Sequence, residues 1–102
     1  MLHVIATATV KPGQREAFLA EFRKVVPEVL REEGCIEYGP TVDLPTNLPA
    51  QGDERPDVVV ILEKWESVEA LEKHLVAPHM IEYRNRVKDL VESVSLQILK
   101  PV

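Results

Sequence analysis

The period of the apolar positions changes along the chain, and each change marks a new predicted element. Residues 2–10, LHVIATATV, alternate apolar and small polar side chains, which predicts a β-strand. Between Gln14 and Glu33 the apolar residues recur every three or four positions, which predicts an amphipathic helix. Pro27 removes a backbone donor and is expected to kink this helix, and Gly34 is placed to cap its end. The apolar stripe of the helix consists of Phe18, Phe22, Val25, Val26, Val29 and Leu30.

Two further strands flank a long irregular segment in the middle of the chain. Residues 35–43, CIEYGPTVD, predict the second strand, and residues 57–65, DVVVILEKW, predict the third. The segment 44–56 between them holds three prolines, one glycine and few apolar residues, so it predicts a long loop. Whether this loop acts as a lid or as a dimer clasp does not follow from the sequence.

The last third of the chain predicts a broken helix and a final strand. Ser67 is a good N-cap for a helix over residues 68–77. Pro78 interrupts this helix, and a second helical piece is expected over residues 79–91. Residues 93–99, SVSLQIL, alternate again and predict the fourth strand. The buried stripe of the first helical piece is expected to hold Val68, Leu71 and Leu75.

The order β-α-β followed by β-α-β predicts a ferredoxin-like α+β fold for one domain spanning residues 1–102. Right-handed crossovers place the first and third strands side by side at the centre, with the helices on one face of the sheet. Strand 57–65 is apolar on both faces, but helices on one side cover only one of them. The uncovered face therefore predicts a homodimer. The two faces are formed by Val58, Val60 and Leu62, and by Val59, Ile61 and Trp65.

Charge and composition narrow the range of partners. The formal net charge is −5 with acids and bases interspersed, which argues against nucleic acid or an anionic membrane surface as the main partner. No apolar stretch reaches the ~18 residues of a membrane span, and the N-terminus lacks the layout of a signal peptide. Cys35 is the single cysteine, which rules out an internal disulfide and a CxxC zinc site. We therefore expect a cytoplasmic protein.

The chemically richest segment is residues 63–80, EKWESVEALEKHLVAPHM. Strand alternation puts Glu63 and Trp65 on one face of the third strand. On the following helix, His74 lies about 60° from Leu71, at the edge of the buried stripe, where it can reach a cavity or point to water. Trp65 is equally interpretable as a core side chain, Glu63 as a surface carboxylate and His74 as a hydrogen-bonded structural residue. The same ambiguity holds for His79 as a helix-start residue, and for Tyr38 and Tyr83 as core residues with anchored hydroxyls.

Signatures of metal sites and common cofactors are missing from the sequence. His74 and His79 are five residues apart with a proline between them, so they do not form the helical pair of an HExxH site. The chain has no GxGxxG or GxxxxGK(S/T) motif for nucleotides, and no GxSxG or Cys/His signature of an acyl enzyme. Any catalysis is expected to use acid–base groups in an apolar pocket, with no metal and no protein-bound cofactor.

Three segments carry a family resemblance: VIATATVKPGQREAF, VVPEVLREEGCIEYGPTVD and VVVILEKWESVEALEKHLVAPHMIEY. Together they resemble the antibiotic-biosynthesis-monooxygenase family of dimeric α+β barrels, most closely its small bacterial quinol monooxygenases. The likeness covers essentially the whole chain. It implies a homodimer, with further assembly left open, that oxidises menadiol-type hydroquinones to quinones with molecular oxygen and without metal, flavin or haem.

The resemblance also implies a role for each candidate residue. His74 would be the general base, since an unperturbed histidine titrates near neutral pH, and Trp65 would be the pocket wall that orients the ring. Some members that oxidise aromatic polyketides carry an amide side chain four residues before the tryptophan. This chain has Ile61 there, which weakens the transfer of that substrate class. The expected substrate-binding residues are Tyr38, Glu63, His79 and Tyr83.

The same fold hosts other functions, so alternatives stand beside the quinol monooxygenase. A haem-degrading relative would aim a histidine of the second helix at iron. A non-catalytic dimeric module for small-molecule binding or stress response would bind a quinone without turning it over. An isomerase that acts through the same histidine is a further alternative.

Overall fold

Four strands and three helices follow one another in the order β-α-β-β-α-α-β in the computed structural model, which describes residues 1–102. None of the helices combines the length and the apolar character that a membrane-spanning helix needs. The elements are β1 (Leu2–Val10), α1 (Arg15–Leu30), β2 (Cys35–Thr41), β3 (Val58–Trp65), α2 (Val68–Leu75), α3 (Pro78–Val87) and β4 (Val91–Leu99).

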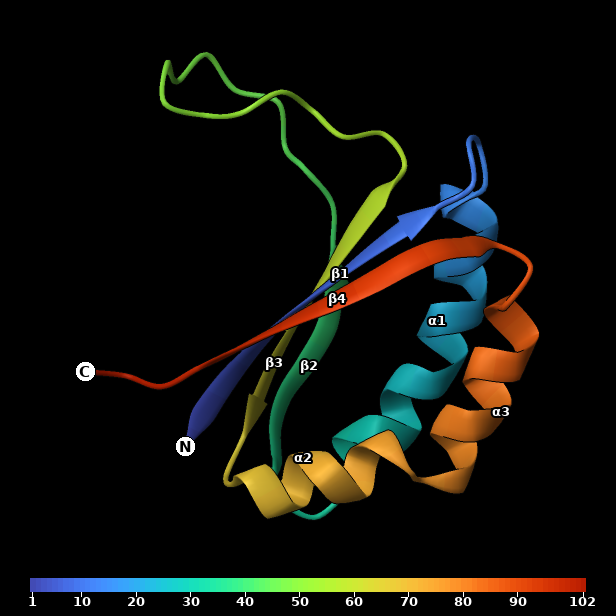
Figure 1. Cartoon of the computed structure of the whole chain (residues 1–102), viewed down its shortest axis with the longest axis vertical. Helices are drawn as coiled ribbons and strands as arrows, with labels where there is room; N and C mark the ends of the chain where they lie inside the picture. Colours follow the sequence, from blue (N-terminus) through green and yellow to red (C-terminus); the bar gives the residue numbers. More distant parts are fainter.

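The strands form one antiparallel sheet in the order β2-β3-β1-β4. The first and third strands are therefore central neighbours, as predicted, and the fold is ferredoxin-like α+β. Helices α1 and α3 lie on one face of the sheet, while α2 lies across the end of β2 and β3, near the end of α1 (Figure 1). The segment between β2 and β3 projects beyond the sheet at the opposite end (Figure 1). This arrangement brings the ends of α1 and β3 together with both short helices.

The core forms between the helices and one face of the sheet because alternate strand residues point the same way. In β1 these are the five buried positions from Leu2 to Val10, and in β3 they are Val59, Ile61, Glu63 and Trp65. Aromatic rings of α1 fill the space above: Phe18 and Phe22 stack with centroids 6.0 Å apart. Burying a large apolar side chain stabilises the fold by about 1.5–3 kcal/mol, so this layer holds the helices on the sheet.

The end of α1 differs from the prediction. The helix continues through Pro27 but ends at Leu30 with Arg31 as its C-cap, so the expected extension to Glu33 and the cap at Gly34 are wrong. Gly34 instead lies in the turn that enters β2, with a φ of +85° that favours glycine. A Cβ at this position would lie 2.5 Å from the Cβ of Ala70, so the glycine also permits close contact with α2.

The second half differs from the prediction mainly at its element ends. Helix α2 ends at Leu75 rather than residue 77, and Pro78 is the first residue of α3 rather than a break before it. Helix α3 ends at Val87, and residues 88–91 leave the helix because Val91 already pairs with Val10 of β1. The other shifted ends are those of β2, which stops at Thr41, of β3, which begins at Val58, and of β4, which begins at Val91.

Candidate active site

The end of β3 places a carboxylate and an indole side by side in the core. Glu63 and Trp65 share one face of the strand, as predicted; this face is turned toward the helices, and the two residues are 7% and 0% exposed. The Trp65 Nε1–H donates a hydrogen bond of 2.9 Å to Oε1 of Glu63. Tyr38 pairs with Glu63 across the neighbouring strand β2 and is also buried. The carboxylate is therefore enclosed rather than solvated.

His74 projects from α2 onto this cluster. Its ring centroid lies 4.7 Å from that of Trp65 and 5.3 Å from that of Tyr38, and the residue is only 2% exposed. The prediction of an edge position is wrong, because the buried face of α2 is rotated toward His74 and leaves Val68 51% exposed. Ser67 begins the helix as predicted, since its hydroxyl accepts the N–H of Ala70.

Glu32, which the sequence did not single out, joins the two candidate histidines. Its Oε2 lies 2.9 Å from Nδ1 of His74 and 2.7 Å from Nε2 of His79. His79 reaches this oxygen because Pro78 starts α3 at the point where the chain turns back toward α1. Glu32 precedes His74 by 42 residues, so the only sequence signal was a carboxylate near Gly34, the residue that was expected to cap the helix. No group of three His, Cys, Asp or Glu side chains is arranged to hold a metal ion.

Burial raises the pKa of the acid in this cluster and lowers the pKa of its base. Burial raises the pKa of Glu63 to about 7. The hydrogen bond from Trp65 opposes this shift, and the negative charge of Glu32 adds a smaller increase. Burial lowers the pKa of His74, and the hydrogen bond and charge of Glu32 oppose that effect. Burial, followed by the charge of Glu63, raises the pKa of Tyr38, so its hydroxyl stays protonated. The site thus holds a neutral imidazole beside a carboxyl that titrates near pH 7.

The contact with Glu32 selects one tautomer of His74. A carboxylate oxygen only accepts, so the nitrogen that faces it, Nδ1, carries the proton. The other ring nitrogen, Nε2, then holds the free lone pair and can accept a proton from a bound molecule. His74 is therefore arranged as a base whose orientation is set by a carboxylate.

Tyr83 is more distant from this cluster than the other predicted residues. It is buried on α3, and its ring packs edge-on against Phe22 at 5.6 Å and Phe18 at 6.3 Å. Burial also raises the pKa of its hydroxyl. The structure thus brings five of the six predicted site residues into one hydrogen-bonded and stacked group, and links Tyr83 to it through the Phe22 ring, which stacks on Tyr38 at 5.5 Å.

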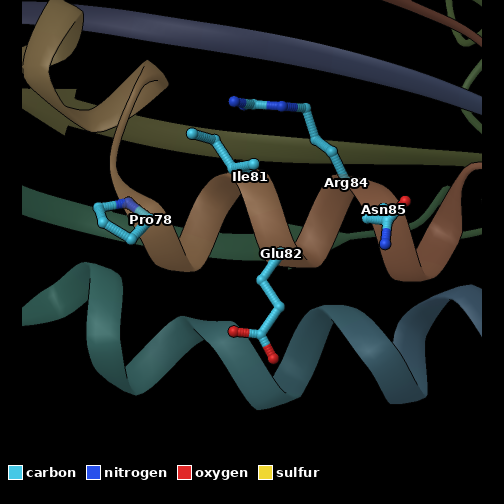
Figure 2. Close-up of a pocket in the computed structure, with 5 residues that line it drawn as sticks. All are labelled: Pro78, Ile81, Glu82, Arg84 and Asn85. Atoms are coloured by element: carbon cyan, nitrogen blue, oxygen red, sulfur yellow. The ribbon is translucent and has the colours of Figure 1, made fainter.

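The cluster is closed by its own side chains. None of the five principal surface depressions is lined by Trp65 or His74. The depression of about 670 Å³ lies on the outer side of α3, where Glu82 points toward α1 (Figure 2). It holds no residue of the buried cluster. An aromatic ligand at Trp65 and His74 therefore requires movement of the surrounding side chains.

Comparison with known proteins agrees with the fold. The family described as "Antibiotic biosynthesis monooxygenase" matches residues 1–86. The chain is 46% identical to "Probable quinol monooxygenase YgiN" of Escherichia coli strain K12, over 99% of this chain and 98% of that protein. It is 31% identical to Rv0793 of Mycobacterium tuberculosis, over 97% and 89% of the two chains.

Solved structures show the same architecture. A crystal structure described as an antibiotic biosynthesis monooxygenase superposes with a TM-score of 0.81 at 25% identity, covering 100% of this chain and 99% of the other. The structure of Rv0793 superposes with a TM-score of 0.78 at 27% identity, covering 99% and 94%. The resemblance seen in the sequence is thereby confirmed. The chain belongs to the antibiotic biosynthesis monooxygenase family.

Proposed function

We propose that this protein is a cofactor-independent quinol monooxygenase of the cytoplasm, with His74 as its general base. The proposal rests on the placement of His74. Its neutral imidazole ring is buried with its centroid 4.7 Å from that of the Trp65 indole, and Glu32 holds its Nδ1. The 46% identity to a protein named for quinol oxidation supports the substrate class.

The proposed reaction needs no electron carrier because the hydroquinone supplies the electrons itself. Its hydroxyl gives a proton to Nε2 of His74, and the resulting quinolate passes one electron to O₂. The semiquinone and superoxide recombine into a ring C–O bond, and protonation gives a hydroperoxide. Loss of the ring C–H and cleavage of the O–O bond then release water. The products are a hydroxyquinone and one water, so four substrate electrons reduce one O₂.

The remaining cluster residues orient the substrate in this proposal. Trp65 offers a flat apolar wall for the quinol ring. Tyr38 has a protonated hydroxyl that can donate to a substrate oxygen, and Glu63 holds the indole in place through its 2.9 Å hydrogen bond. Tyr83 and His79 line the periphery, at α3.

Oxygen uptake with menadiol, measured above the autoxidation rate, tests the proposal. We expect His74→Gln to lower kcat by about 10²–10⁴-fold, the usual contribution of a general base. His3→Gln is the matched control, because His3 alternates with the buried residues of β1 and points to the other face of the sheet. An unchanged rate for His74→Gln at saturating menadiol would remove His74 from the mechanism.

One observation favours a second candidate, a small-molecule-binding module without turnover: the cluster is filled by its own side chains. Trp65 is the only tryptophan, so its fluorescence reports directly on ligands at this site. Quenching by menadione without menadiol-dependent oxygen uptake would favour the binding module. The haem-degrading alternative gains no support, because His74 is 2% exposed and is held by Glu32.

We further infer that the protein works as a homodimer. Leu62 of β3 is 42% exposed on the sheet face that carries no helix. On the edge strand β4, Val94, Leu96 and Ile98 are between 41% and 59% exposed, because the helices stop short of it. A second sheet packed on the helix-free face would cover Leu62, and parts of the same copy that reach around the edge of β4 would cover the other three residues. Sedimentation equilibrium should give a dimer for the wild type and a monomer for Leu62→Glu, whereas a wild-type monomer would contradict the inference.

A further inference from the structure

We propose that Glu32 and His79 form a proton path that connects the buried base His74 with solvent. The proposal rests on the function proposed above and adds two positioning residues to it. Three titratable side chains from three separate parts of the chain meet at one oxygen atom, Oε2 of Glu32. The other side-chain hydrogen bond of the buried cluster, between Trp65 and Glu63, lies inside it and does not lead to the surface.

Exposure rises step by step along this path. The His74 side chain is 2% exposed, Glu32 is 13% exposed and His79 is 24% exposed. On the far side of the His79 ring, Nδ1 lies 3.9 Å from Oε2 of Glu28, whose side chain is 51% exposed. His79 and Glu28 both border a surface depression of about 240 Å³. The path therefore begins at a buried nitrogen and ends at water.

The first two transfers along the path follow contacts of 2.9 Å and 2.7 Å that are already formed. When Nε2 of His74 accepts the quinol proton, Nδ1 can release its own proton to Oε2 of Glu32. When the His79 ring carries its proton on Nδ1, its Nε2 can accept the proton of the Glu32 carboxylic acid. Nδ1 then releases its own proton to water on the side of the ring that faces Glu28. The reverse sequence returns one proton through His74 to the reduced oxygen. The number of protons therefore balances over the cycle.

The path solves a problem that the closed cluster creates. An imidazolium formed among Trp65, Tyr38 and Glu63 is poorly solvated, because burial disfavours its charge. Moving the proton to the surface restores the neutral base while the quinolate reacts with O₂. The charged groups that act on His74 besides Glu32 are His79 and Arg84, both on α3.

Removing the path without touching the base tests this proposal. His79→Ala leaves the 2.9 Å contact between His74 and Glu32 in place and opens space for a free imidazole molecule. We measure kcat for menadiol in a buffer too bulky to replace the missing imidazole. We expect it to fall about 100-fold, at the lower end of the contribution of a proton-transfer group, with KM unchanged. Added imidazole should restore the rate in a saturable way, whereas sodium chloride at equal ionic strength should not.

Two further variants separate a proton path from a structural role. Glu32→Gln should lose at least as much activity as His79→Ala and should not respond to imidazole, because the link to His74 is broken. Glu33→Gln removes the same charge one residue along, on an exposed side chain, and should behave like the wild type. An unchanged kcat for His79→Ala, or a loss that imidazole does not restore, would overturn the proposal.

Nuclear magnetic resonance of ¹⁵N-labelled histidines distinguishes failure of the path from failure of the proposed function. The wild type should show His74 with its proton on Nδ1, and Glu32→Gln should alter the titrations of both His74 and His79. If menadiol is not oxidised but these coupled signals are seen, the path stands and the quinol reaction falls. If His74 carries its proton on Nε2, the path is wrong whatever the activity.

Discussion

Glu63 is a buried carboxyl group, and replacing it should abolish a loss of stability that sets in as the pH rises. Glu63→Gln keeps an oxygen that can accept the Trp65 N–H and removes the ionisable group. In the folded wild type the pKa is raised from 4.5 to about 7, so the native state binds the proton more tightly than the unfolded chain. Its contribution to stability is complete below pH 4.5 and is lost as the pH rises through 7.

The size of the effect follows from the two pKa values. Raising a carboxyl pKa from 4.5 to about 7 corresponds to about 3 kcal/mol, of which about 2.5 kcal/mol falls between pH 5 and pH 8. The free energy of unfolding of Glu63→Gln minus that of the wild type should therefore be about 2.5 kcal/mol larger at pH 8 than at pH 5. Other titrating groups affect both proteins alike, so the difference isolates Glu63.

Urea unfolding at pH 5 and pH 8, at one fixed protein concentration, measures this difference. Glu72→Gln is the matched control, because Glu72 is exposed on α2 and its removal should change the two free energies equally. A difference between Glu63→Gln and the wild type that stays constant within about 0.5 kcal/mol would refute the reasoning. Glu63 would then be solvated rather than enclosed by Trp65 and Tyr38.

Three other predictions concern single residues. Gly34→Ala should lower the free energy of unfolding by about 3 kcal/mol, from the left-handed backbone and the clash with Ala70, whereas Gly13→Ala, at a similar φ in open space, should cost about 1 kcal/mol in the same urea titration. Ser67→Ala should cost about 1 kcal/mol through loss of the α2 cap, measured by thermal unfolding, and Ser67→Asp should restore most of it. Burial raises the pKa of Cys35 to about 11, so its alkylation by iodoacetamide at pH 8 should be about 100-fold slower than that of a thiol with a pKa of 9.

The periods of the apolar positions predicted the element types correctly, and the handedness of the crossovers correctly placed β1 and β3 side by side at the centre of the sheet. Alternation in β1 and β3 and the three-to-four spacing in α1 are imposed by burial on one side, which is a local property of the sequence. Element ends were less predictable because they depend on distant partners. Val91 belongs to β4 because Val10 is available to pair with it, and nothing beside Val91 in the sequence reveals that partner.

The candidate site was predictable to the extent that it lies within one element. Glu63 and Trp65 share a face because strand residues two apart always do, whereas the buried position of His74 depends on how α2 rotates against the sheet. Val68 was expected in the buried stripe of α2 because it is apolar and lies three residues before Leu71. The packing at the end of β3 instead buries an imidazole, which finds a carboxylate partner there.

The role of Glu32 could not be predicted from the sequence, because its position depends on a contact between segments that are far apart along the chain. Gly34 approaches α2 so closely that a side chain there would overlap Ala70, and its carbonyl accepts the N–H of Glu66 at 2.8 Å. These contacts hold the turn after α1 against the first turn of α2. His74 lies four residues after Ala70, one helical turn further along the same face, so it meets the carboxylate that precedes the glycine. The glycine that resembles a helix-ending signal in the sequence thus allows Glu32 to reach a buried histidine, and the orientation of the proposed base depends on that backbone contact.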